Sequence, residues 1–214
     1  MPRVIPSVEP LQMVRQREAS PVVNVSIPGQ GAREVFRLDN ETLAFRFTAT
    51  VGSRRADPFE RLTTPARLDL WLDANGLRLG SKTARAADLV AAHELREAIH
   101  RAGKAIANNQ KPAPADIDTI NEAVRQGRAY LELGDGNARW RSDGPAPIGD
   151  ALALIAENAI QVLGGQDRQR VKTCEGPDCG GLYLDTSRGG NRRWCSMNTC
   201  GNKAKKAAMR VLQG

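Results

Sequence analysis

Four cysteines near the C-terminus limit what this chain can fold into more than any other feature of the sequence. Cys174 and Cys179 enclose four residues, Cys195 and Cys200 enclose four more, and fifteen residues separate the two pairs. Two short loops with two thiolates each are typical of a tetrahedral zinc site, with zinc about 2.3 Å from each sulfur. We therefore expect these four cysteines to hold one structural Zn²⁺ per chain.

Two disulfides, or four unrelated buried thiols, are the alternatives. Disulfides need an oxidising compartment, and the N-terminal stretch lacks the apolar segment of an export signal. The chain also has no run of eighteen apolar residues, so we expect no membrane span and a cytoplasmic protein.

The chemistry expected of this chain is not catalytic. Four cysteine ligands leave zinc no open position for a water molecule. The rest of the chain has no cysteine, contains His93 and His100 as its only histidines, and shows neither a P-loop nor a nucleophile elbow. We predict that the protein is not an enzyme, and that the two histidines lie at the core edge or surface rather than on a metal.

The positive charge of the chain is confined to the cysteine-containing end. Residues 168–214 carry ten Lys and Arg against three acids, which accounts for the whole formal net charge of +7. Four thiolates on one divalent ion would lower this charge by two and leave the segment basic. A basic surface on one small module is typical of proteins that bind the phosphates of nucleic acids. The alternative is that the basic residues only make the chain more soluble.

The length of 214 residues predicts one medium domain and one small module. We expect an irregular, proline-rich arm over 1–32 with a short strand at Val22–Ile27, a front domain over 33–165, and a cysteine module over 168–214. The expected fold class is α+β: a helical domain with a small antiparallel sheet, followed by a four-cysteine zinc module that ends in a basic helix.

Within the front domain, hydrophobic periodicity predicts most elements. Alternation over Leu43–Val51 predicts a strand that pairs with Glu34–Leu38. A hairpin is predicted over Ala129–Arg141, with its turn at Asp135-Gly136, and its strands are expected to join the same antiparallel sheet. Helical segments are predicted at four places: from Pro65 to Asn75, Thr83 to Asn108, Pro114 to Gly127, and Ile148 to Leu163, the last apolar nearly all round.

The second cysteine pair is expected to lead into a helix that runs to Leu212. At about 100° per residue, the helix would pack through one side, Ala204, Ala208 and Val211, and present cations on another. We expect double-stranded DNA to be contacted by six residues, the helix cations and three loop arginines: Lys203, Lys206, Arg210, Arg188, Arg192 and Arg193. Trp194 is expected to pack beside the metal site, with base stacking as the alternative.

Other roles for the two parts remain open at this stage. The cysteine module could bind a protein rather than DNA, and the front domain could bind a small molecule, form a homodimer or serve as support. Salt dependence distinguishes protein binding from DNA binding by the cysteine module, since counterion release makes DNA binding steeply salt-dependent.

The cysteine module also resembles a known family. Four stretches are similar to the pattern of the CGNR zinc finger: Cys-x4-Cys, Tyr183-x-Asp185-x-Ser187-Arg188, Arg193-Trp-Cys-Ser-Met and Cys200-Gly-Asn-Lys. In the last of these, Lys203 stands in place of the usual Arg. Residues 43–165 more loosely resemble the α/β domain called ABATE that precedes this finger in the family. The resemblance implies a bacterial transcription regulator, stress-responsive in type.

Overall fold

The computed structural model describes residues 31, 33, 35–134 and 136–212, with side chains as far as Arg210. The arm expected at 1–32, with its strand at Val22–Ile27, lies almost wholly outside the described residues. The helices are α1 (Leu43–Thr48), α2 (Pro65–Ala74), α3 (Ala86–Ala107), α4 (Pro114–Arg125), α5 (Pro147–Gly164) and α6 (Asn202–Leu212). The strands are β1 (Val51–Gly52), β2 (Phe59–Glu60), β3 (Tyr130–Gly134), β4 (Asn137–Arg141), β5 (Val171–Thr173) and β6 (Leu182–Leu184).

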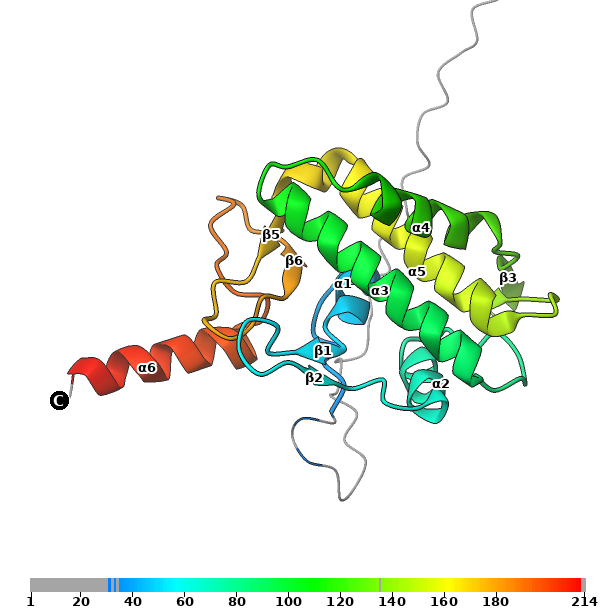
Figure 1. The fold of residues 1–214 in the computed structure, drawn as a ribbon, viewed down its shortest axis with the longest axis horizontal. Coiled ribbons are helices and arrows are strands. Elements are labelled where there is room, and N and C mark those ends of the chain that lie inside the picture. Colours follow the sequence, from blue (N-terminus) through cyan, green and yellow to red (C-terminus); the bar gives the residue numbers. More distant parts are fainter. Residues whose placement is uncertain (1–30, 32, 34, 135, 213–214) are drawn as a thin grey trace, which may run out of the picture.

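Helices α3, α4 and α5 pack on one another and form the body of the front domain (Figure 1). All four predicted helical segments are confirmed within a few residues. The Thr64 side chain accepts a hydrogen bond from the backbone N–H of Arg67 and so caps α2. Most of helix α5 is buried, as its apolar sequence predicts, with Ile155 and Ala156 inaccessible to solvent, but its second half exposes a stripe that includes Glu157 and Ile160. No helix in the described part of the chain has the length and apolar character needed to cross a bilayer.

The predicted strand over Leu43–Val51 is wrong, because most of this segment is helix α1. Phe45 and Phe47 are fully buried, and Thr48 and Thr50, which alternation places on a solvent face, are buried too. Their hydroxyl groups donate to the carbonyls of Phe45 and Phe47. The two threonines therefore satisfy their own polar groups locally, which removes the need for a solvent-exposed face.

The predicted single sheet is also wrong. The described strands form three separate two-stranded antiparallel sheets, β1–β2, β3–β4 and β5–β6. The β3–β4 hairpin is confirmed, with Tyr130 opposite Arg141 and Gly136 at a positive φ of 84° in its turn. It does not pair with the segment from Leu43, and residues 35–38 form no strand but bury Phe36 and Leu38 in the core.

The cysteine module docks on the front domain at one end of α3. Val171 and Leu182, from β5 and β6, belong to the same buried cluster as the residues of α3 and α5. Helix α6, drawn in red in Figure 1, then projects away from the rest of the molecule. Of the side expected to pack, Ala204 is half-buried and Ala208 is exposed, while the side chain of Val211 lies outside the described residues; the described part of α6 therefore shows no packed side. The fold is α+β, a helical domain followed by a four-cysteine cluster and a terminal helix.

Candidate metal centre and its basic helix

The four cysteine sulfur atoms converge on one point. The ligand atoms of Cys174, Cys179, Cys195 and Cys200 all lie within 4.8 Å of one another. Cys195 Sγ is 3.6 Å from Cys179 Sγ and 3.7 Å from Cys200 Sγ. A regular tetrahedron of sulfurs about 2.3 Å from zinc has edges of about 3.8 Å. The spacing of the thiols therefore fits one tetrahedral Zn²⁺, as the sequence predicts.

Local backbone structure sets the positions of these thiols. In the first loop the N–H of Cys179 donates to the carbonyl of Gly176, which closes a tight turn. The N–H groups of Gly176 and Cys195 both point at Cys174 Sγ, at 3.4 Å. A side chain at Gly176 would place its Cβ 3.2 Å from that of Cys179, so glycine permits the close approach.

The electrostatics of the cluster call for a cation. Hydrogen bonds from Cys179 and Cys195 lower the pKa of Cys174 to about 6. The pKa of the Cys195 thiol is raised, because it hydrogen-bonds to the three neighbouring sulfurs and is buried. Four thiolates this close would repel one another strongly, and a divalent ion at their centre removes that repulsion. When bound, Zn²⁺ would serve as a structural link between the two loops.

The front domain holds the first cysteine loop through its β1–β2 turn. The backbone N–H groups of Arg54 and Arg55 donate to the carbonyls of Cys179 and Asp178, each at 3.1 Å. The Arg55 guanidinium donates to the carbonyl of Cys174 at 2.9 Å. Asn40 adds a hydrogen bond to the carbonyl of Leu182 at 3.0 Å. Residues far from the cysteines in the sequence therefore fix the loop that carries two of the ligands.

Arg37 from the front domain reaches the second cysteine loop. Its guanidinium donates to the Thr199 hydroxyl and lies 3.9 Å from Cys195 Sγ. Burial acts to lower the pKa of Arg37, but the Cys195 thiolate, as it is when it binds a metal, and the Asp39 carboxylate outweigh burial and raise that pKa. The guanidinium therefore stays charged beside the thiolates and offsets part of their negative charge.

His100 is a third contact between the two parts. Its Nε2 lies 3.0 Å from the carbonyl of Gly180. Burial, together with the positive charge of Arg54, lowers the pKa of His100 to about 4, so the ring is neutral near pH 7 and donates to the carbonyl. His93 Nε2 lies 3.0 Å from the carbonyl of Leu62. Both half-buried rings contact backbone carbonyls, in agreement with the core-edge position predicted for them.

Comparison with known proteins identifies both parts. Residues 41–166 match the model of the ABATE family, described as "Putative stress-induced transcription regulator". Residues 170–211 match the model of the CGNR zinc finger. The chain belongs to the ABATE family. A search of curated proteins found no match. Neither family is an enzyme family by its description.

The loop between β6 and the second cysteine pair of the CGNR finger is organised by Asp185. Its carboxylate accepts hydrogen bonds from Lys172 Nζ at 2.7 Å, from Ser187, and from the backbone N–H of Arg192 at 3.1 Å. Burial opposes ionisation of Asp185, but these donors hold its pKa well below the ordinary value. This acid, part of the motif that resembles the CGNR pattern, therefore has a structural role in the loop.

The loop arginines of the CGNR finger, predicted to bind nucleic acid, lie in different surroundings. Arg192 donates to the carbonyls of Trp194 and Cys195, at 2.8 and 2.6 Å, and its guanidinium lies over the Tyr183 ring. Arg193 pairs with Glu175 at 2.5 Å and lies over the half-buried ring of Trp194. Arg188 is exposed. Two of the three thus have partners within the finger; their contact with DNA stays a prediction.

The helix cations of the CGNR finger are free by comparison. Lys203, Lys206 and Arg210 are exposed on α6, and none of them forms an ion pair with another described residue. They follow one another by three and four positions, which places them on one face of the helix. Their contact with nucleic acid stays a prediction too, but the structure leaves their charges available.

Sequence reasoning missed the residues of the front domain that contact the metal centre. Arg37, Asn40, Arg55 and His100 all contact the CGNR finger, yet none of them shares a motif or a spacing with the cysteines. The adjacent pair Arg54-Arg55 gives no specific signal, because adjacent cations also occur at Arg192-Arg193 and Lys205-Lys206. Such contacts depend on the docking of two folded parts, which spacing along one chain does not encode.

Proposed function

We propose that the protein is a cytoplasmic, zinc-stabilised transcription regulator that binds double-stranded DNA through α6. The observation that carries the proposal is the face of α6 that presents Lys203, Lys206 and Arg210 without ion partners in the described structure. Zinc fixes the start of this helix, because Cys200 lies two residues before Asn202. Unpaired cations at helical spacing can each neutralise a phosphate and release a counterion.

Binding of a random-sequence duplex, measured by fluorescence anisotropy at several salt concentrations, tests this proposal. If about five phosphates are neutralised, log K falls with log salt at a slope of about −4 to −5. The variant K203A/K206A/R210A should weaken binding and reduce that slope by about 3. Lys205→Ala is the matched control, because Lys205 lies about 200° around α6 from Lys203.

A protein-binding role for the CGNR finger is the second candidate. Met197 and Met209 are 63% and 51% exposed, and exposed methionines on a small module are typical of adaptable protein contacts. A packed protein interface would depend far less on salt. If the zinc-loaded chain binds no duplex at low salt, DNA binding is refuted and the protein-binding role is favoured.

A further inference from the structure

A groove of about 880 Å³ separates α6 from the ABATE domain. One wall is the face of α6 that carries Lys203, Lys206 and Arg210. The opposite wall comes from the front domain and the segment that leads into it, and includes Arg33, Phe59 and Arg61. The cations of α6 therefore face the β1–β2 side of the front domain across the groove. The loop arginines that the sequence suggested as an extension of this face do not line it.

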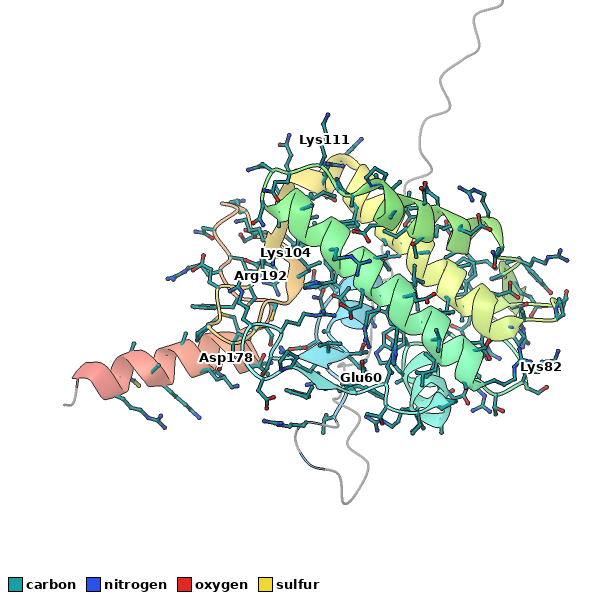
Figure 2. The ribbon with its side chains drawn as sticks, in the orientation of Figure 1. Glu60, Lys82, Lys104, Lys111, Asp178 and Arg192 are labelled. Atoms are coloured by element: carbon teal, nitrogen blue, oxygen red, sulfur yellow. The ribbon has the colours of Figure 1, made fainter. Side chains whose placement is uncertain are left out.

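The base of the groove is formed by the metal centre itself. Cys179, Cys200 and Asp178 line it, and Figure 2 shows Asp178 beside the first turn of α6. Asp178 supplies a single carboxylate against six Lys and Arg side chains in the lining: Arg33, Arg37, Arg61, Lys203, Lys206 and Arg210. The six cations exceed this carboxylate and the charge of about −2 that four thiolates leave on a divalent ion, so the groove suits an anionic occupant.

Among the cations of the wall opposite α6, Arg33 is the one best placed for a ligand. The Arg61 guanidinium donates to the carbonyls of Val35 and Ala49, and Arg37 is used at the metal centre. The Arg33 side chain is 68% exposed and lies with its guanidinium carbon 5.2 Å from the centre of the Phe59 ring. Its partner is an exposed carboxylate, Asp57, at 3.1 Å.

An exposed ion pair of this kind is weak, so a phosphate can displace it. Phosphate accepts two hydrogen bonds from a guanidinium, and the Phe59 ring keeps the guanidinium in position through a cation–π contact. Asp57 would oppose the approach of a phosphate, because it carries the same sign of charge. The groove has the volume of a small-ligand site, which suits the backbone of one strand rather than a whole duplex.

We propose that the front domain is itself part of the DNA interface: Arg33, held over Phe59 just before the residues that match the ABATE family, contacts the phosphate backbone of the strand that α6 binds across the groove. This inference rests on the proposed function, and it assigns the front domain a direct contact with DNA. The two domains then hold one strand from both sides, and the metal centre sets the distance between the walls.

Two substitutions with opposite expected effects test this inference on the full-length, zinc-loaded chain and the random duplex. Arg33→Ala should weaken binding several-fold at low salt and reduce the salt slope by about one. Asp57→Asn should tighten binding, because it frees Arg33 and removes a negative charge. Arg85→Ala is the matched control: Arg85 is 83% exposed, pairs with Asp88 at 3.5 Å and lies outside the groove.

The outcomes separate this inference from the proposed function. Duplex binding that is lost in K203A/K206A/R210A but unchanged by both Arg33→Ala and Asp57→Asn would overturn the inference alone. Effects of these two substitutions that are confined to single-stranded DNA would also overturn it. Absence of duplex binding by the unmodified chain would overturn both. Opposite effects of the two substitutions on duplex binding, with Arg85→Ala unchanged, would support it, since general loss of stability cannot tighten binding.

Discussion

Leu182→Ala should destabilise the whole chain, although Leu182 lies in the CGNR finger. Leu182 is 2% exposed and packs among the residues of the ABATE core. A Cβ on Gly103 of α3 would lie 2.5 Å from Leu182 Cδ1, so this glycine provides the space into which Leu182 fits. Truncation of a buried leucine to alanine typically lowers the free energy of unfolding by about 2 to 5 kcal/mol. For a chain of this size that corresponds to a fall in Tm of roughly 5 to 15 °C.

The assay should report the ABATE domain and the metal centre separately. Trp71 is fully buried in the ABATE core beside Phe47, with ring centroids 5.1 Å apart. In a background with Trp140 and Trp194 replaced by Phe, Trp71 fluorescence follows unfolding of the front domain, and a chromogenic chelator follows zinc release. Leu182→Ala should move both transitions down together. Leu133→Ala is the control, since Leu133 is 83% exposed and should change stability by less than about 0.5 kcal/mol.

A shift of only one of the two transitions would refute the coupling of the finger to the ABATE core through Leu182. If Leu182→Ala brings zinc release to lower temperature but leaves the Trp71 transition unchanged, the finger and the ABATE domain unfold independently. The shared hydrophobic cluster would then contribute little to the stability of the front domain. Coincident transitions with the expected shift would establish one cooperative unit.

Two further predictions concern the contacts between the domains. Arg37→Met should lower zinc affinity about tenfold in a chelator competition assay, because it removes the positive charge beside Cys195 Sγ. Arg78→Met, at an exposed site, is the control, and equal zinc affinity of the two variants would contradict the prediction. The pKa of His100 is about 4 in the folded chain, against an ordinary value of 6.5. Between these two pH values the unfolded chain takes up a proton that the folded chain does not. The stabilisation by neutral His100 is therefore complete above pH 6.5 and is lost as the pH falls toward 4. The stability difference between wild type and His100→Gln should therefore shrink over that range in denaturant titrations, and a difference independent of pH would exclude the role of His100.

Local sequence patterns were sufficient wherever one segment decides its own structure. The cysteine spacing predicts the tetrahedral site because each ligand pair is only a few residues apart, and zinc joins two such local turns. The same holds for the apolar α5 and for the β3–β4 hairpin, where Gly136 permits the turn. These features depend on periodicity, turn chemistry and ligand type, which are all short-range.

Tertiary structure decided what the sequence left ambiguous. The sequence of Leu43–Thr48 alternates like a strand, yet this segment is a helix whose two phenylalanines pack in the core with α3 and α5. The helix can be buried because the hydroxyls of Thr48 and Thr50 donate to nearby backbone carbonyls. Helix α6 presents its cations toward the ABATE domain because Val171 and Leu182 dock the finger on α3. Docking depends on complementary buried surfaces from segments far apart in the chain. The sequence by itself therefore determined the metal site and most helices, and only the folded chain decided which surfaces face one another.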